Sequence, residues 1–335
     1  MAKPSKNTNT IAVIGAIIFL IVLPHFGLND YWVGLIVKCM VWSLLAMSLD
    51  ILVGHLGVRS LGHGAFWGFG AYLVVITYVR FGFNIWMAMG SAFLGVILLG
   101  MLFAAVTAHI KGVTYLMVSL ALAQVLWGLA FQNSAITGGD NGLSGVQRVT
   151  FFAGINSMLQ FYYFTLLVVV ISTALIVLII RSPLGSIVRS IKQSEVRMSI
   201  LGYDVWRFKF IIIVISAIFG GIAGILHCQY IQFVSTIDVS TLISAKALLM
   251  VLIGGVGTLI GPVIGAFVIT LLEAVVSTYT ARWSLILGVL FVIAVFCLNH
   301  GLYGLFRDIV KKIRHTQGAG YSGVDAPGCE EGEGS

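Results

Sequence analysis

Charged residues are scarce in this chain: only 9% of its 335 residues are Asp, Glu, Lys or Arg, whereas 59% are hydrophobic. Soluble domains carry about 25% charged residues and about half apolar ones. A soluble fold has too little interior to bury so much apolar surface, so this shortage excludes a soluble globular domain. The bilayer is then the solvent for most of the chain, and the spanning segments must close their backbone hydrogen bonds within helices or a barrel.

Short segments of alternating polarity, which build membrane β-barrels, are also lacking. The apolar residues instead form long unbroken runs, such as residues 163–180 and 210–226. Four cysteines, Cys39, Cys228, Cys297 and Cys329, show no metal-like or redox-like spacing. The net charge of +7 comes from Lys and Arg residues scattered between apolar runs, which favours membrane topology over nucleic-acid binding. The sequence therefore predicts an all-α polytopic membrane protein.

The apolar runs divide into about ten candidate transmembrane helices, since a span needs ~20 apolar residues. These are residues 11–28, 32–53, 64–80, 85–108, 113–132, 160–180, 210–227, 242–257, 261–277 and 283–299. With the N-terminus in the cytoplasm, fourteen Lys and Arg residues fall on the cytoplasmic side and three on the outer side. Lys38 and Lys246 lie inside spans and complete the nineteen. Because cytoplasmic loops are rich in Lys and Arg, both termini are predicted to be cytoplasmic.

One membrane domain with two tails is the expected organisation. Residues 1–10 form a cytoplasmic N-terminal tail, residues 11–315 the transmembrane domain, and residues 316–335 a polar, glycine-rich tail that reads as disordered. The first apolar run, residues 11–23, is interpreted as an anchor rather than a cleavable signal. No small-x-small cleavage site follows it, and Pro24 stands where cleavage would occur.

Residues 181–209 (RSPLGSIVRSIKQSEVRMSILGYDVWRFK) form the only long polar cytoplasmic stretch between predicted spans. Ser182 and Pro183 suit the N-cap and first position of a helix, and Gly202 suits its C-terminal stop. Apolar residues recur between them at helical spacing. The pattern predicts an amphipathic helix that lies on the membrane or docks in a groove of a partner. A basic surface helix that merely fixes topology is the alternative.

Five blocks of the chain, in the same order, resemble ABC-importer permeases of the branched-chain amino acid type. They are residues 53–72 (VGHLGVRSLGHGAFWGFGAY), 115–142 (with LAQ and TGGDNG), 194–209 (SEVRMSILGYDVWRFK), 249–266 (LMVLIGGVGTLIGPVIGA) and 299–306 (NHGLYGLF). The resemblance covers nearly all of residues 32–306. Asp50 stands where the family usually has Asn, and Thr236 where Pro is common. These departures leave the cargo open.

The resemblance implies a permease subunit in the bacterial inner membrane, not an enzyme. Its expected partners are two ATP-binding subunits, a second related permease and a periplasmic substrate-binding protein. The chain has no G-x(4)-G-K-(S/T) phosphate loop, so ATP would bind to the partner and no cofactor is expected here. Branched-chain or hydrophobic amino acids are the implied cargo, and urea or short amides, carried by close relatives, are the alternative. An ion-coupled secondary transporter would need paired intramembrane acids, and Asp50 is the only deeply placed one. No HExxH, paired-aspartate or nucleophile-elbow pattern supports a membrane-embedded enzyme.

Residues 181–209 would then be the coupling segment, seated in the ATP-binding subunit. Glu195, Arg197 and Arg207 are candidates for polar contacts there. Met198, Ile200 and Leu201 would fill a pocket of the partner, and Gly202 would end the helix. On the opposite side, Asp140 and Arg148 in the outer loop, residues 133–160, are candidates for docking of the binding protein. The same composition also describes an ordinary turn.

Polar and glycine residues inside spans are the candidates for the translocation path. Intramembrane ionisable residues are costly and mark functional sites by default. Broken helices in two halves of a transporter point to its binding site, although small residues more commonly serve close helix packing. One possibility is that Asp50 pairs with Lys246 across the bundle. The path candidates are Asp50, His63, Ser119, Gln124, Lys246, Gly254 and Gly255, with Lys38 and Glu273 as further intramembrane charges.

Overall fold

The computed structural model describes residues 29–150 and 157–279, together with residues 15, 19–26, 282, 285, 286, 288, 289 and 292. Helices make up most of these ranges. The longer helices are α2 (Asp30–Asp50), α3 (His63–Val79), α4 (Ile85–Thr107), α5 (Gly112–Gln132), α7 (Ser157–Arg181), α10 (Val205–Ile231), α11 (Thr241–Gly254) and α12 (Ile260–Tyr279). The shorter elements are η1 (Leu23–Phe26), η2 (Ile51–Leu56), α6 (Ser134–Thr137), η3 (Gly139–Asn141), β1 (Leu143–Ser144), α8 (Pro183–Gln193), α9 (Glu195–Ile200), β2 (Phe233–Val234) and η4 (Thr236–Val239).

The prediction of an all-α polytopic membrane protein is confirmed. Six helices of the described part are long and apolar enough to span a bilayer: α2 with its η2 extension, α4, α5, α7, α10 and α12. Helices α3 and α11 are apolar but shorter. These eight helices coincide with eight of the ten predicted spans to within a few residues. The predicted span 11–28 is described only in part, and residues 283–299 fall mostly outside the described residues, so the total of ten stays a prediction.

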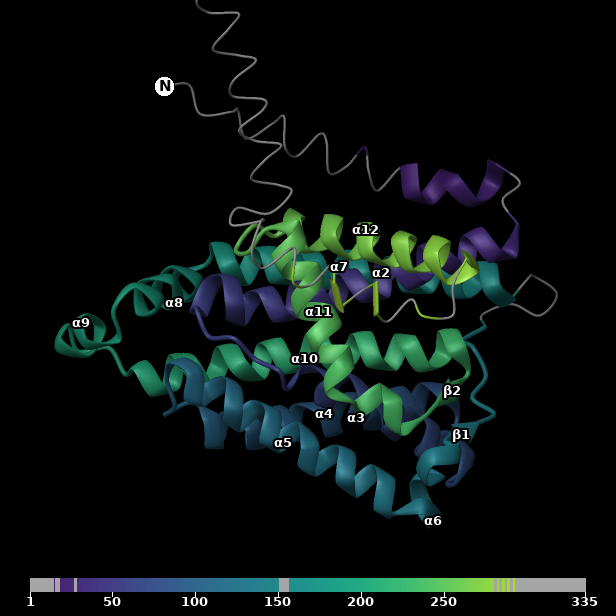
Figure 1. Cartoon of the computed structure of the whole chain (residues 1–335), viewed down its shortest axis with the longest axis horizontal. Coiled ribbons are helices and arrows are strands. Elements are labelled where there is room, and N and C mark those ends of the chain that lie inside the picture. The colour runs from purple at the N-terminus through teal and green to yellow at the C-terminus, as the bar shows by residue number, and fades with distance from the viewer. Residues whose placement is uncertain are drawn as a thin grey trace, which may run out of the picture.

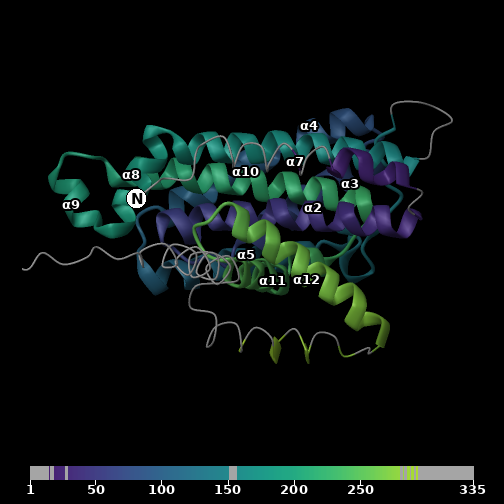
Figure 2. The same ribbon diagram turned by 90° about the horizontal axis from the view of Figure 1, so that it is seen from above.

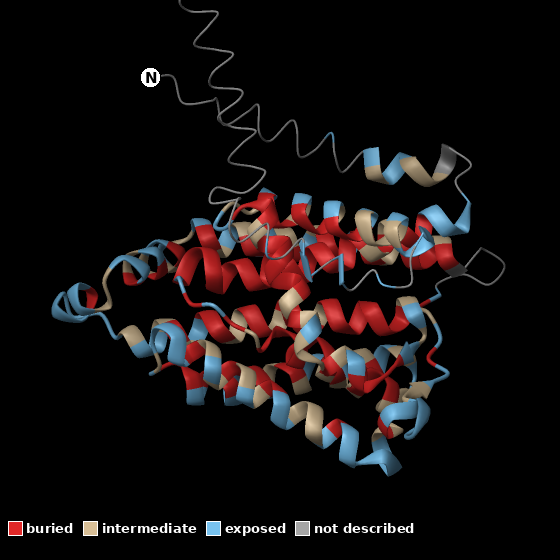
Figure 3. Ribbon diagram, viewed as in Figure 1, coloured by how far each residue is buried: buried red, intermediate tan, exposed pale blue. Residues whose placement is uncertain are grey.

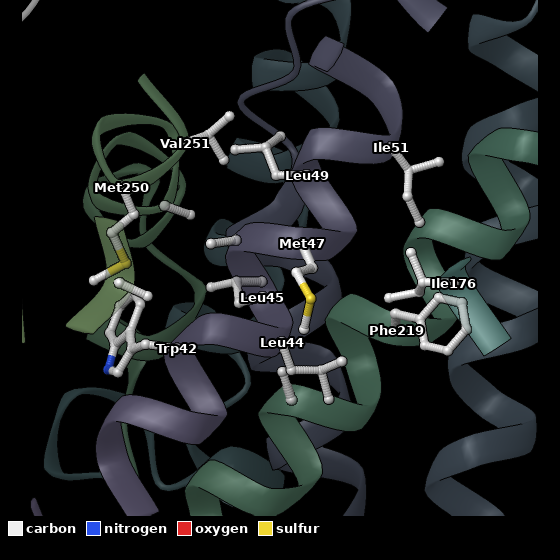
Figure 4. Close-up of a cluster of buried hydrophobic side chains, with 14 of the residues drawn as sticks. Trp42, Leu44, Leu45, Met47, Leu49, Ile51, Ile176, Phe219, Met250 and Val251 are labelled. Atoms are coloured by element: carbon white, nitrogen blue, oxygen red, sulfur yellow. The ribbon is translucent and has the colours of Figure 1, made fainter. Parts of the chain in front are cut away.

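Helix α2 lies at the centre of the bundle, packed against α7, α10, α11 and α12 (Figures 1 and 2). Within its apolar window, 89% of the residues are buried, against 22% for α5 on the outside (Figure 3). In Figure 4 Leu45 of α2 points toward the side of Met250 and Val251 of α11, and Ile51 of η2 lies beside Ile176 of α7 and Phe219 of α10. A helix that is apolar on all sides is a buried helix, and α2 has this character.

Both glycine-rich blocks break the helical course, as predicted. Helix α2 passes into a one-turn π-helix, η2, which ends at the left-handed Gly57 (φ 83°), and α3 begins only at His63. In the second block α11 ends at Gly254 and α12 begins at Ile260. The turn between them holds Gly255 and Gly257 at φ values of 117° and 77°, which favour glycine.

Helices α8 and α9 project beyond the ends of the spans at one end of the molecule (Figure 1). Ser182 is the N-cap of α8 with Pro183 at the first turn, and Gly202 is left-handed (φ 84°), as the sequence predicts. The expectation of one continuous helix is wrong. Ser194 adopts an extended conformation and its hydroxyl accepts a hydrogen bond from the Arg197 N–H, so it caps a separate helix, α9.

The opposite end of the molecule carries the outer loop (Figure 1). Strand β1 of this loop pairs antiparallel with β2, which follows α10 directly. Leu143 lies opposite Val234 and Ser144 opposite Phe233. The next element, η4, begins with a capping box between Ser235 and Asp238. The loop is thereby joined to the connection between α10 and α11.

Candidate functional site

Glu195 holds the coupling segment against the membrane domain. Its carboxylate contacts Lys209 Nζ at 2.5 Å, at the start of α10, and Lys111 Nζ at 2.8 Å, between α4 and α5. Lys209 also donates to the carbonyl of Ile110 at 3.3 Å. Partial burial favours the neutral acid, but the two ammonium groups outweigh it and hold the pKa of Glu195 below its ordinary value. We call this arrangement the Glu195 clamp, and it joins three separate segments.

The free face of α9 is apolar. Val196, Ile200 and Leu201 are 64%, 78% and 70% exposed, whereas Met198 is only 7% exposed and packs into the main core. Helical spacing accounts for Val196 and Ile200, since each is two residues from Met198 and so lies on another side of the helix. Leu201 is the C-cap, just past the end of α9. The interpretation of Met198 as filling a partner's pocket therefore does not fit, because its side chain is used inside this chain. Ile200 and Leu201 do point outward.

The polar candidates of the coupling segment differ in their surroundings. Arg197 lies on the exposed side of α9. Arg207 forms an ion pair at 2.8 Å with Asp204, with both side chains largely exposed. Asp204 in turn caps α10 by accepting from the Arg207 N–H. Arg207 thus lies at the exposed start of α10, and its ion pair is of the kind that contributes little to stability.

Asp50 and Lys246 do not pair with each other. Asp50 is fully buried, and its Oδ1 accepts from the Gly257 N–H at 2.7 Å, while its Oδ2 has no hydrogen-bond partner among the described residues. Lys246 contacts Glu273 Oε2 at 2.6 Å and lies 4.1 Å from the centroid of the Trp42 ring. Asp50 ends α2, where His55 Nδ1 lies 4.0 Å from its Oδ2, whereas Lys246 lies on α11 with Glu273 as its ionic partner.

A triad of intramembrane charges joins α2, α11 and α12. Lys38 contacts the same Glu273 oxygen at 3.3 Å that Lys246 contacts at 2.6 Å. The side chains of Lys246 and Glu273 are 10% and 12% exposed, and that of Lys38 is 26% exposed. One carboxylate is thus shared by two ammonium groups. Glu273 is thus the central residue of this triad.

His63 and the two polar candidates of α5 are all engaged in contacts between helices. His63 Nε2 lies 2.9 Å from Ser216 Oγ, which donates to the Ser48 carbonyl at 2.6 Å. Ser119 Oγ accepts from the Leu61 N–H at 3.2 Å. Gln124 donates to Thr241 Oγ1 at 2.6 Å, at the start of α11, and remains exposed. Gln124 is the polar candidate that stands on an open surface.

Gly254 and Gly255 stand at the end of α11, where close packing accounts for the first of them. A Cβ added at Gly254 would collide with the carbonyl of Gly261 in α12. Gly255 needs its positive φ to leave the helix. Both glycines are therefore explained by the turn itself, in line with the packing role of small residues in membrane helices.

The outer loop is tied down by its polar residues. Thr236 donates to the Asp140 carboxylate at 3.3 Å, and Arg148 Nη2 donates to the Tyr230 carbonyl at 3.2 Å. Arg148 also borders a cavity of about 490 Å³ at this end. The cavity is lined by Asp30, Tyr31, Gly34, Arg148, Met158, Tyr230 and Ile231. Asp140 itself remains exposed at the surface.

Sequence reasoning missed Lys111, Lys192 and Lys209. All three were counted only as topology-setting charges, yet each donates to a specific oxygen within the protein. Gly257 was read as one glycine among many, although its N–H is the partner of Asp50. No local signal marks these contacts, because each joins residues far apart in the chain.

Comparisons with known proteins agree with one another. A family profile described as "Branched-chain amino acid transport system / permease component" matches residues 31–295. Two relatives, from Escherichia coli (strain K12) and Salmonella typhimurium (strain LT2), are each 26% identical over 320 aligned residues, which cover 88% of this chain and 75% of the relative. Both are named high-affinity branched-chain amino acid transport system permease protein LivM. No solved structure matches the chain significantly.

Proposed function

Because the chain belongs to the family of branched-chain amino acid transport system permease components, we propose that it is the membrane-spanning subunit of an ATP-driven importer. Transport against a gradient needs an energy source, and the sequence holds no phosphate-binding loop. ATP is therefore proposed to bind to separate subunits, and the chain itself is a transport subunit without catalytic activity. Branched-chain amino acids, the cargo class in the names of both relatives, are the proposed cargo.

The single observation that favours ATP coupling is the projecting pair of helices α8 and α9. An exposed apolar tip in water is costly unless a partner covers it, and such patches mark interaction sites. Ile200 and Leu201 form this tip, and the Glu195 clamp fixes α9 to α10 and to the connection between α4 and α5. A force applied to the tip by a partner would reach two spans directly. This arrangement suits a mechanical input.

Topology supports the same assignment of sides. We propose ten spans, with residues 1–10 and 316–335 as cytoplasmic tails and residues 11–315 as the permease domain. The coupling segment then lies in the cytoplasm of a bacterial inner membrane, where ATP is available. The outer loop with Asp140 and Arg148 faces the periplasm, where a binding protein is proposed to dock. The two ends of the molecule are occupied by these two segments (Figure 1).

The proposed path runs along the face that carries Gln124. A polar pair on the lipid-facing side of a helix would be unfavourable, yet Gln124 and Thr241 form a short hydrogen bond on an open face of α5 and α11. A second, related permease subunit would cover this face and leave the pair lining a polar passage. Ser119, Lys246 and the broken helices lie on the elements behind it.

Affinity purification from native membranes tests the proposal. The tagged chain is solubilised in detergent, and the proteins that co-purify are identified by mass spectrometry. Recovery of an ATP-binding subunit and a second permease is the expected result. If the chain purifies without any nucleotide-binding protein, and uptake of labelled leucine collapses with the proton or sodium gradient rather than with ATP, an ion-coupled secondary transporter replaces this proposal.

A further inference from the structure

Three segments far apart in the sequence meet at the inner end of α2. The π-helix η2 presents Asp50 at its start and the carbonyl of Gly54 within it. Asp50 Oδ1 accepts from the Gly257 N–H at 2.7 Å, in the turn between α11 and α12. Lys192 Nζ, from the last turn of α8, donates to the Gly54 carbonyl at 2.7 Å. The projecting α8 is thus connected through η2 to the second helix break.

The residues of this connection are closely packed. A Cβ added at Gly54 would lie 2.6 Å from the Cα of Gly257, so the two backbones touch. A Cβ at Gly57 would lie 2.7 Å from Cγ of Lys192, so the stem of the lysine lies directly on the end of η2. Asp50 is fully buried and cannot exchange its partner for water. Displacement of α8 must therefore displace η2, and displacement of η2 must move the turn.

The π-helix η2 is an uncommon type of helical turn. Single π turns inside helices are rare and occur frequently at functional sites. Gly54 lies in the last turn of η2, where helix carbonyls lack an intrahelical partner, and its carbonyl accepts from Lys192 instead. The charged donor makes this a stronger bond than one between neutral groups. A methionine at position 192 could fill much of the space of the lysine stem but could not donate to this carbonyl.

We propose that Lys192 and Asp50 are positioning residues that transmit movement of the coupling segment to the turn between α11 and α12, and we call this contact chain the Lys192–Asp50 link. It rests on the proposed function, and it assigns to Lys192 a role that the clamp at Glu195 does not provide. The clamp fixes α9 to α10 and to the α4–α5 connection. The link instead reaches the two broken helices, and through α11 and α12 it reaches Thr241, Lys246 and Glu273.

Hydrogen exchange tests the link without any partner. The full chain is placed in lipid nanodiscs, and amide exchange of a peptide covering residues 253–259 is followed by mass spectrometry. Lys192→Met keeps the stem and removes the ammonium group, and exchange in the turn should rise roughly three- to ten-fold, the loss of about one hydrogen bond. Lys192→Arg should restore wild-type exchange. Gln193→Met changes an exposed side chain of the same helix and should change nothing.

Asp50 provides the second pair of variants. Asp50→Leu removes the acceptor of the Gly257 N–H, whereas Asp50→Asn keeps an acceptor oxygen at the same place. Exchange in the turn should rise for the leucine variant and stay near wild type for the asparagine variant. If Asp50→Leu does not fold, Lys192→Met still decides the matter. Unchanged exchange in residues 253–259 of Lys192→Met overturns the link.

A transport assay separates this inference from the proposed function. Proteoliposomes that hold the complete importer are supplied with ATP, and the ATP hydrolysed per cargo molecule is measured. Lys192→Met should raise this ratio several-fold while ATP hydrolysis continues, and Gln193→Met should keep it. If the wild type shows no ATP-driven uptake, the proposed function fails, and the exchange experiment still reports on the contact. If the wild type imports cargo and Lys192→Met keeps its ratio, the role in transmission is wrong.

Discussion

The carboxylate of Glu195 and the ammonium group of Lys209 lie 2.5 Å apart across the junction between α9 and α10. The side chain of Lys209 is only 2% exposed, so its charge is withdrawn from water and compensated by this contact and by the Ile110 carbonyl. The pair joins the projecting helix α9 to α10, one of the helices long enough to span a bilayer. Loss of this ion pair should lower the stability of the chain and weaken its proposed coupling to the ATP-binding subunit.

Glu195→Gln should lower the thermal stability of the solubilised chain. The substitution leaves Lys209 buried without a carboxylate, which costs about 1–3 kcal/mol for a partly screened pair. The measurement is a thermal unfolding curve in detergent. Arg207→Ala is the matched control, because it breaks an exposed ion pair worth less than about 1 kcal/mol. Equal losses of thermal stability in the two variants would show that the Glu195 clamp contributes no more than an exposed ion pair.

The Glu195 clamp should also have a defined pH dependence. Burial raises the pKa of Glu195, but Lys111 and Lys209 lower it further, so in the folded chain it lies below the ordinary value of 4.5. The stabilisation is then complete above that ordinary value and is lost as pH falls through the lowered one. The difference in unfolding midpoint between wild type and Glu195→Gln should be constant from about pH 6 to about pH 8. A difference that disappears near neutral pH would contradict the clamp.

Substitutions at the exposed tip formed by Ile200 and Leu201 should weaken binding of a partner without lowering the stability of the chain. Ile200→Asp and Leu201→Asp place a charge on exposed apolar positions and should weaken binding of the ATP-binding subunit at least about ten-fold, as expected for central interface residues. Their unfolding temperatures should stay near wild type. Met198→Ala should do the reverse, lowering stability by about 2 kcal/mol through a core cavity. Binding is read from titration of the purified partner, and wild-type affinity in both aspartate variants would exclude this face.

Gly224 and Gly90 differ in whether close helix packing requires a glycine. A Cβ at Gly224 of α10 would collide with the carbonyl of Trp67 in α3, whereas a Cβ at Gly90 of α4 meets nothing within 4 Å. Gly224→Ala should therefore destabilise the chain by about 2 kcal/mol or more, and Gly90→Ala should be neutral or slightly stabilising. Thermal unfolding of both variants decides this, and similar curves would argue against tight α3–α10 packing.

The charge triad predicts an asymmetry between its members. Lys246→Met leaves Glu273 its contact with Lys38, whereas Glu273→Gln removes the carboxylate that both lysines contact. The second change should lower the unfolding temperature more, because two ammonium groups repel each other in a medium of low polarity. The double variant should be more stable than Glu273→Gln alone. A double variant that is worse than either single one would overturn this account.

Prediction from the sequence succeeded where the signal is local and failed where it is not. Long apolar runs placed eight helices. Ser182 and Pro183 marked the start of α8 correctly and Gly202 the stop after α9, because caps and stops depend on the residues beside them. The split at Ser194 was missed because the apolar spacing continues through it, although serine is itself a capping residue. The partner of Asp50 could not be read at all. The partner is the backbone N–H of Gly257, 207 residues away, and no side-chain pattern in the sequence indicates which backbone group will donate.

The central position of α2 has a consequence for membrane insertion of the chain during its synthesis. This helix is synthesised early, yet most of its contacts are with α7, α10, α11 and α12, which follow more than a hundred residues later. Until these emerge from the ribosome, Lys38 and Asp50 would face lipid or the insertion machinery without the partners that make them tolerable in a bilayer. A nascent chain that ends before Thr241 is therefore a natural substrate for membrane quality control, and the last third of the protein completes the burial of the first.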